Sequence, residues 1–198
     1  MRKVTTSNVM QEVSKSHSTK LRLPEKGDGR RNQELLAPFG KESIRRKRKL
    51  DPNYIAGFID GEGSFSISLG KHKTLKRRLE IRPEFEIELR ADDREILERI
   101  LITIGCGRIY DLSYERYGWY PHVKYKIGNA KEMQQFLFPL LDTYPLQAKK
   151  REVYVRFKQI VQMFLKKDHL SDRGFNRVLK LREEMRALGK KAKVYGNR

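Results

Sequence analysis

Strict alternation of apolar and polar residues is the feature of this sequence that most restricts its fold. In residues 81–90, the apolar positions from Phe85 to Leu89 are separated by single glutamates. A period of two predicts a strand that buries one face and exposes the other. Residues 64–69 and 120–127 repeat the pattern, so we expect an antiparallel sheet that is covered on one face only.

Segments with the helical spacing of apolar residues stand between these strands. Asp51 followed by a proline marks the start of a helix, and Gly61 and Gly63 mark its end. Asp92 and Glu95 are typical of a capping box for a second helix. Further elements are expected as helices over 92–104, 130–141, 147–166 and 172–188 and as a strand over 108–113. The order αββαββα, followed by C-terminal helices, indicates an α+β fold.

The chain carries 44 lysines and arginines against 25 aspartates and glutamates, which gives a net charge of +19. Residues 1–50 contribute 14 basic and 5 acidic residues, and residues 51–198 contribute 30 and 20, so the excess is not confined to a tail. A basic surface spread in this way is typical of proteins that bind nucleic-acid phosphates.

Other function classes are excluded by composition. One cysteine cannot form a disulfide scaffold or a multi-thiolate zinc site within one chain. No apolar run is long enough to span a membrane, and the N-terminus lacks the apolar core of a signal peptide. We therefore expect an intracellular protein with no membrane partner and no secretion signal.

Residues 1–50 are polar and weakly periodic, and we interpret them as a basic N-terminal extension before a domain over residues 51–198. The extension ends in a run of five basic residues, Arg45, Arg46, Lys47, Arg48 and Lys49. Such a run is typical of a solvated or localisation segment. Its position directly before the domain equally suggests an arm that contacts DNA phosphates.

The candidate chemistry lies between Tyr54 and Phe65. Gly57 and Gly61 are four residues apart on one helix face, where a second backbone can approach closely. Glu62 lies between two glycines at the helix C-terminus, where the helix dipole disfavours a carboxylate. A carboxylate placed against the local field suggests a divalent cation, and Mg²⁺ prefers such oxygen ligands. Ordinary helix packing and a solvated turn acid explain the same residues without any ligand.

The string from Ile55 to Gly63 resembles the LAGLIDADG motif. The resemblance to this family continues in four later segments, which are residues 83–87, Ile96 with Leu97, residues 105–109 and residues 144–150. The combination makes residues 51–165 similar to a LAGLIDADG homing endonuclease.

This resemblance implies that Glu62 and the backbone carbonyl of Gly63 bind a catalytic Mg²⁺ or another divalent metal. It also implies that Ala56, Gly57 and Gly61 let two motif helices pack tightly. The chain contains one motif, and one metal-binding carboxylate cannot cut two strands. The resemblance therefore implies a symmetric homodimer with two copies of Glu62 near adjacent scissile phosphates.

Accessory residues are also implied. The family commonly uses a basic residue near the late loop, and Lys149 is the first candidate, with Lys150 as its neighbour. Homodimeric members often carry a polar residue at the end of the second strand, where this chain has Leu89. Arg90 is expected to turn inward as its substitute, unless the water network is organised differently.

The exposed face of the sheet is the expected DNA-reading surface, because strands can lie in the major groove and arginine recognises guanine there. The predicted contacts on this face are Ser66, Ser68, Arg82, Arg108, Tyr110, Lys124 and Lys126. Glu80, Glu84, Glu86 and Glu88 share the face. Carboxylates can accept hydrogen bonds from cytosine, but a row of them near phosphates is costly. Some are therefore expected to pair with neighbouring arginines.

The implied function is site-specific cleavage of double-stranded DNA at a long pseudo-palindromic target, by an intron-encoded homing endonuclease that requires Mg²⁺ or another divalent metal. The prokaryotic cytoplasm or an organelle matrix is the expected location, and intron RNA is a further partner that the resemblance allows. Two alternatives keep the fold without cleavage: an RNA maturase and a cleavage-inactive DNA-binding regulator.

Overall fold

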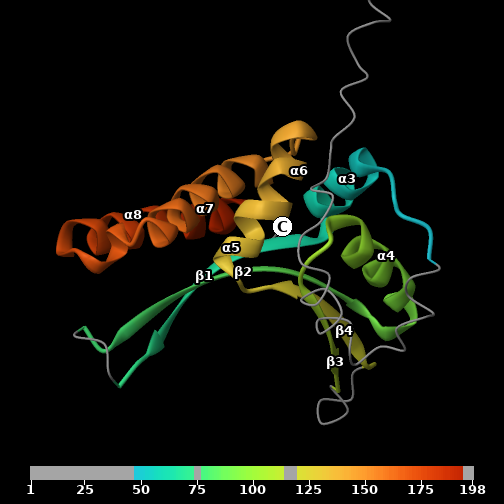
Figure 1. The fold of residues 1–198 in the computed structure, drawn as a ribbon, viewed down its shortest axis with the longest axis horizontal. Helices are drawn as coiled ribbons and strands as arrows, with labels where there is room; N and C mark the ends of the chain where they lie inside the picture. Colours follow the sequence, from blue (N-terminus) through green and yellow to red (C-terminus); the bar gives the residue numbers. More distant parts are fainter. Residues whose placement is uncertain (1–46, 74–76, 114–119, 194–198) are drawn as a thin grey trace, which may run out of the picture.

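A computed structural model describes residues 47–73, 77–113 and 120–193 of the 198-residue chain. Within these ranges, four strands form one antiparallel sheet in the order β1-β2-β4-β3. The sheet is arched, the helices cover its convex side, and its concave side is open (Figure 1). The predicted α+β fold, with helices on one face of an antiparallel sheet, is confirmed.

Strands β1, β2 and β4 follow the predicted alternation of buried and exposed residues, and β3 was predicted as a strand. Their bounds are β1 (Gly63–Lys71), β2 (Leu79–Arg90), β3 (Arg108–Leu112) and β4 (His122–Ile127). The register places Ser64, Glu86, Lys126 and Arg108 side by side in one row across all four strands. The side chains of this row lie on the open face, because the residues beside them along each strand point into the core.

The helices of the described ranges all lie on the other face (Figure 1). Their bounds are α3 (Pro52–Glu62), α4 (Arg94–Ile104), α5 (Ala130–Glu132), the π-helical segment η4 (Met133–Leu137), α6 (Phe138–Thr143), α7 (Lys150–Leu165) and α8 (Asp172–Lys193). Two 3₁₀ turns, η2 (Ala91–Asp93) and η5 (Asp168–Leu170), precede α4 and α8. The predicted start of α3 is confirmed, because the Asp51 side chain accepts a hydrogen bond from the Asn53 N–H at 2.8 Å.

The predicted capping box of α4 is wrong. The 3₁₀ turn η2 occupies residues 91–93, so α4 begins at Arg94, and the residue before it makes no side-chain capping bond. Asp92 instead accepts a hydrogen bond from Arg90 at 2.9 Å. The ion pair of Asp92 with Arg90, the last residue of β2, therefore takes the place of the predicted helix cap.

Other helix boundaries moved as well. The first helix continues through Gly61 to Glu62, the segment predicted over 130–141 continues to Thr143, and α8 continues past Gly189 to Lys193. Helix α7 starts at Lys150 rather than at the predicted residue 147. The backbone N–H groups of Gln147 and Ala148 donate to the side chain of Asp60, and these two residues precede the helix.

Aromatic rings form the centre of the core, between the sheet and the helices. Phe65 of β1 packs against Phe85 of β2, with ring centroids 5.0 Å apart, and against Phe157 of α7 at 5.2 Å. Phe85 and Phe157 are fully buried. The core therefore ties the first two strands to the long helix α7 that crosses them.

Helix α8 covers the outer part of the β1–β2 arm. Its apolar residues Val178, Leu181 and Met185 are buried. Arg182 donates from Nε to the backbone carbonyl of Ile67 at 2.8 Å. This helix therefore braces the arm from the convex side (Figure 1). None of the described helices is long and apolar enough to cross a membrane.

Gly107 precedes β3 and allows a sharp turn in the backbone. Its φ is +91°, and a Cβ there would lie 2.7 Å from the Tyr125 ring and 2.9 Å from the Lys126 carbonyl oxygen. We expect Gly107→Ala to lower the free energy of unfolding by about 3 kcal/mol, because backbone strain and overpacking add. Urea denaturation measures this. Gly128→Ala is the control, because its Cβ would meet only ordinary contacts. Equal losses in both variants would contradict the explanation.

Candidate active site

The turn from α3 into β1 has no room for a side chain at Gly63. The N–H of Gly63 donates to the carbonyl of Ile59 and ends the helix. A Cβ at Gly63 would lie 2.7 Å from both the carbonyl oxygen and the Cγ2 of Ile59. The backbone therefore passes directly from helix to strand, and Glu62 is fixed as the last helical residue.

Glu62 is exposed at the C-terminal end of α3. The helix dipole disfavours a negative charge at this end. Among the described residues, no hydrogen bond or ion pair compensates the carboxylate. An exposed acid in an unfavourable field is available to a cation from solution.

Lys150 is the lysine that contacts the motif. Its Nζ donates to the carbonyls of Ile59 at 3.0 Å and Gly61 at 2.8 Å, so it satisfies two of the last carbonyls of α3. Partial burial lowers the pKa of Lys150, and the charges of Asp60 and Glu62, which raise it, offset only part of that effect. An ammonium group is thus bound within the field of the candidate metal ligand.

Lys149, the first candidate from sequence, is exposed at the N-terminal end of α7. Two adjacent lysines at a helix start point in different directions, and sequence alone does not show which faces the motif. The structure favours Lys150 as the basic residue nearest the motif.

Asp60 joins the motif helix to the segment before α7. Its Oδ2 accepts hydrogen bonds from the N–H groups of Gln147 at 2.6 Å and Ala148 at 3.1 Å. Its Oδ1 is buried and has no hydrogen-bond partner within the described ranges. This carboxylate positions the segment that carries Lys150, and the sequence signal for it was its place in the motif.

A metal site in one copy of the chain is incomplete. The described part of the chain contains no group of three histidine, cysteine or acidic side chains that could hold a metal ion. The donors present are the exposed Glu62 carboxylate and the adjacent Gly63 carbonyl. Mg²⁺ accepts few protein ligands and retains several waters, so this oxygen set fits part of a magnesium site.

One face of α3 is open. A Cβ at Gly57 or at Gly61 would meet nothing within 4 Å, and Tyr54, one turn earlier, is 49% exposed. These positions follow the helical spacing of a single face. The structure does not place Ala56 there: it is only 6% exposed and belongs to the hydrophobic core.

Arg90 does not turn toward Glu62. Its guanidinium bonds Asp92 at 2.9 Å and lies over the ring of Tyr120 at 4.6 Å. Leu89 packs against the hydrophobic core. The expectation that Arg90 substitutes for a polar residue at this strand end is therefore wrong in this structure.

The predicted DNA-contacting residues of the sheet share its open face. They are exposed or half-buried, while their strand neighbours are mostly in the core; the set comprises Ser66, Ser68, Arg82, Arg108, Tyr110, Lys124 and Lys126. Arg82 pairs with Glu80 at 2.7 Å, as the sequence led us to expect for an arginine and a glutamate on this face. Lys124 and Lys126 are paired with the glutamates of β2, which the sequence did not predict.

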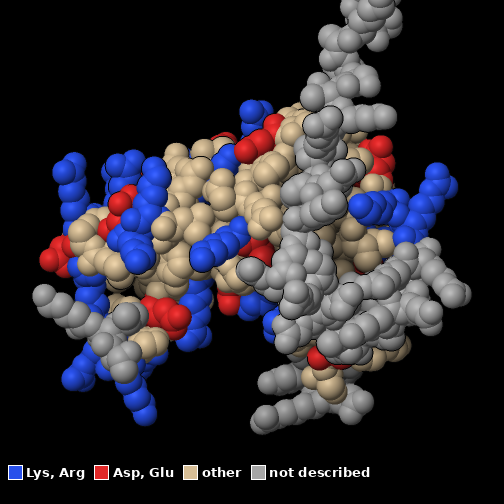
Figure 2. Space-filling model, in the orientation of Figure 1, with Lys and Arg blue, Asp and Glu red and all other residues tan. Residues whose placement is uncertain are grey.

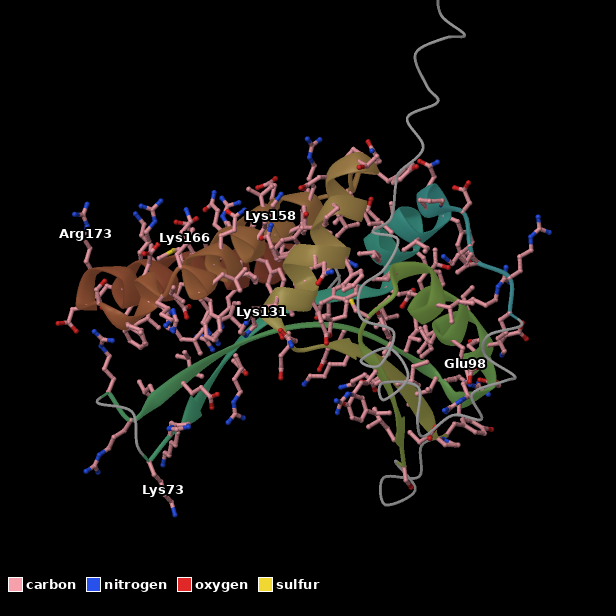
Figure 3. The ribbon with its side chains drawn as sticks, viewed as in Figure 1. Lys73, Glu98, Lys131, Lys158, Lys166 and Arg173 are labelled. Atoms are coloured by element: carbon pink, nitrogen blue, oxygen red, sulfur yellow. The ribbon has the colours of Figure 1, made fainter. Side chains whose placement is uncertain are left out.

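The basic arm before α3 is docked on α4. Lys47 pairs with Glu98, whose side chain is labelled in Figure 3 and which is only 8% exposed. Arg99 donates to the carbonyl of Arg48 at 3.0 Å. Lys47 is therefore already paired, whereas Arg48 and Lys49 are exposed. The other two residues of the run, Arg45 and Arg46, lie outside the described residues.

Basic side chains are spread over the surface in Figure 2, with a concentration around α8 and the tip of the β1–β2 arm. Lys73 extends from this tip below the sheet in Figure 3. The excess positive charge predicted from composition is therefore present on the folded domain.

Comparison with known proteins agrees with the geometry. A family model described as LAGLIDADG endonuclease matches residues 55–161, more than half of the chain. Probable intron-encoded endonuclease 2 of Neurospora crassa is 28% identical over 140 residues, which are 69% of this chain and 29% of that protein. Homing endonuclease I-ApeII of Aeropyrum pernix is 32% identical over 108 residues, which are 54% of this chain and 60% of that protein.

A solved structure shows the same fold. I-SmaMI bound to an uncleaved DNA target in the presence of calcium ions superposes with a TM-score of 0.62 and 26% identity, over 70% of this chain and 48% of that one. The chain spans less than two thirds of the length of each of these three proteins. Because the family model covers the motif helix, the whole sheet and most of α7, this chain belongs to the LAGLIDADG endonuclease family.

Proposed function

We propose that this chain is the subunit of a site-specific DNA endonuclease that acts as a symmetric homodimer on double-stranded DNA and requires a divalent metal. The observation that carries the proposal is the exposed Glu62 at the end of a helix whose glycine face is open. A second copy that packs on this face brings a second Glu62 close to the first.

In this proposal, the sheet and the motif helix have separate roles in binding and in cleavage. The open face of each sheet binds one half of a pseudo-palindromic target, and each Glu62 lies above one scissile phosphate. When bound, the divalent cation, Mg²⁺ or a substitute, neutralises phosphate charge and makes water a better nucleophile. Glu62 and the Gly63 carbonyl would hold this cation, and Lys150 keeps the helix end in place while adding positive charge near the phosphate.

The relatives support this proposal by their names. They are described as intron-encoded or homing endonucleases, and the I-SmaMI structure contains a DNA target and calcium. We propose that this chain is likewise intron-encoded and works in an intracellular compartment that contains DNA. Intron RNA is an additional partner only if the chain also acts as a maturase.

Cleavage of a plasmid library with randomised sites tests the proposal. With Mg²⁺, we expect cuts at one symmetric sequence, and with EDTA we expect bound but uncut DNA. Binding without cutting under both conditions would favour the regulator, and preferential binding to structured RNA would favour the maturase. No enrichment of any DNA sequence would overturn the proposal.

Lys150 is expected to be needed for cleavage, and Lys149 is not. Lys150→Met removes the donor that satisfies two carbonyls of α3 beside Glu62, and we expect the cleavage rate to fall by about 10²-fold. Lys149→Met is the matched control and is expected to change the rate by less than about threefold. Single-turnover cleavage measures both. The reverse order of effects would restore Lys149 as the assisting lysine.

A further inference from the structure

The centre of the open sheet face is not simply basic. Glu84, Glu86 and Glu88 of β2 face the side chains of β4, which are His122, Lys124 and Lys126. We call these six residues the charge ladder. At ordinary pH its charges nearly cancel, so these six side chains together contribute little net attraction for phosphates.

Ion pairs connect all six side chains of the charge ladder in one series. Lys126 contacts Glu84 at 2.6 Å and Glu86 at 3.2 Å, and Lys124 contacts Glu86 at 3.3 Å and Glu88 at 3.1 Å. The sixth member, His122, lies 3.2 Å from Glu88. Each lysine thus bridges two glutamates, one directly across the ladder and one diagonal.

The ladder side chains are 23–32% exposed, so their polar ends remain accessible from the open face. Partial burial lowers the pKa of Lys124 and Lys126, but the hydrogen bonds and charges of the glutamates outweigh it and raise both pKa values. Both lysines are therefore firmly protonated donors, and the facing carboxylates are acceptors.

The chemistry of this arrangement matches one type of base pair. In the major groove, a G·C pair presents the acceptors N7 and O6 on guanine and the donor N4 on cytosine. Lysine donates to guanine, and glutamate accepts from cytosine. A directly opposed glutamate and lysine, such as Glu86 with Lys126, offers one acceptor and one donor side by side.

We propose that the charge ladder is a sequence-reading element that selects G·C pairs in the part of each half-site nearest the cleavage centre. The inference rests on the proposed DNA target and specifies what that target contains. The ladder ion pairs exchange for hydrogen bonds to base edges most favourably at a G·C pair, where guanine offers two acceptors and the cytosine donor lies at the end of the row. At an A·T pair the adenine N6 donor lies between the acceptors N7 and O4, so a carboxylate that approaches it also faces an acceptor and binding is penalised.

Strand geometry fixes the order of the contacts. The register pairs Gly63, next to Glu62, with Ile87, so Glu88 and Glu86 lie nearest the motif and Glu84 lies farther out. Residues on one face of a strand repeat every ~6.8 Å. Base pairs repeat every ~3.4 Å along the helix axis. Successive glutamates therefore address positions about two base pairs apart.

Other residues of the sheet are expected to contact the DNA phosphates and so orient the protein on the DNA. The outer part of the arm carries exposed basic side chains, of which Lys73 is labelled in Figure 3; the others are Lys71, Arg78 and Arg82. Phosphate contacts orient a protein on DNA without reading sequence. The sheet is thus divided into a neutral reading centre and a basic periphery.

Site selection from a randomised DNA library, read by sequencing of bound and cleaved molecules, tests the ladder. The variants are Glu86→Gln and Glu84→Gln, and the wild type is expected to select G·C pairs at the ladder positions. Glutamine pairs with adenine N6 and N7. We therefore expect Glu86→Gln to lower the preference for cytosine over adenine about tenfold at one position per half-site. Glu84→Gln should do so about two base pairs farther out.

Glu184→Gln is the matched control, because Glu184 pairs with Arg156 at 2.8 Å on the helical side and is similarly exposed. It should leave the selected sequence unchanged. If Glu86→Gln lowers thermal stability while the selected sequence stays the same, the ladder only joins strands and the inference is overturned. Wild-type selection of A·T pairs at these positions would also overturn it. If no DNA sequence is enriched by the wild type, the proposed function itself fails.

Discussion

Glu62→Gln is expected to abolish cleavage and leave DNA binding intact. The substitution keeps the size of the side chain and removes the charge that would bind a divalent cation. Loss of a group that stabilises developing charge costs about 10³-fold in rate, and loss of the whole metal site costs more. Because Glu62 is exposed and contacts no described residue through a hydrogen bond or ion pair, we expect the melting temperature to be unchanged.

Cleavage of the selected target in Mg²⁺ and equilibrium binding in EDTA measure the two effects separately. Glu95→Gln is the matched control, since Glu95 is an exposed glutamate in the first turn of α4. It should retain full activity. Cleavage by Glu62→Gln within about tenfold of the wild-type rate would remove Glu62 from the reaction.

Gly57→Leu is expected to convert the proposed dimer into a stable monomer that cannot cut both strands. Nothing lies within 4 Å of a Cβ at this position, so the protomer accommodates leucine. A second motif helix packed on the same face does not. Overpacking costs about 1–3 kcal/mol at each site, and symmetry makes two sites. The dimer dissociation constant should therefore rise about 10²-fold or more.

Light scattering over a concentration series measures the change. Gly189→Leu is the matched control, because Gly189 is also helical and a Cβ there also meets nothing within 4 Å. It should leave the mass unchanged. A wild-type protein that is monomeric both free and on its target would refute the homodimer, as would a Gly57→Leu variant that dimerises normally.

The sheet and the motif helix were predictable because their signals are local. Alternation along β1, β2 and β4 fixes which face is buried, and the Asp51 side chain with the following proline fixes where α3 begins. These signals need no knowledge of distant partners. The open face and the placement of Glu62 followed from them directly.

The sequence could not resolve the features that a distant partner decides. Lys150 contacts the motif through the carbonyls of Ile59 and Gly61, beside the segment whose N–H groups bind Asp60. Lys47 is docked by Glu98, a residue far away in sequence. Ion-pair partners across strands depend on register, and register is a property of the assembled sheet.

The glutamates of β2 illustrate the same limit. Their place on the open face was predicted, together with pairing of some of them to neighbouring arginines, which Glu80 shows with Arg82. The register brings Lys124 and Lys126 against the glutamates from Glu84 to Glu88, because β4 lies between β2 and β3. Only the strand order shows that two predicted DNA contacts are also ion-pair partners.

A mixed dimer tests most directly whether each Glu62 serves one DNA strand. Wild-type and Glu62→Gln chains with different affinity tags are co-expressed, and the heterodimer is isolated by sequential purification. It is then incubated in Mg²⁺ with a supercoiled plasmid that carries one target site. We expect nicked circles as the main product, because one strand is cut and the other is left intact. Linear DNA at the wild-type rate, or no product at all, would contradict the assignment of one Glu62 to each strand.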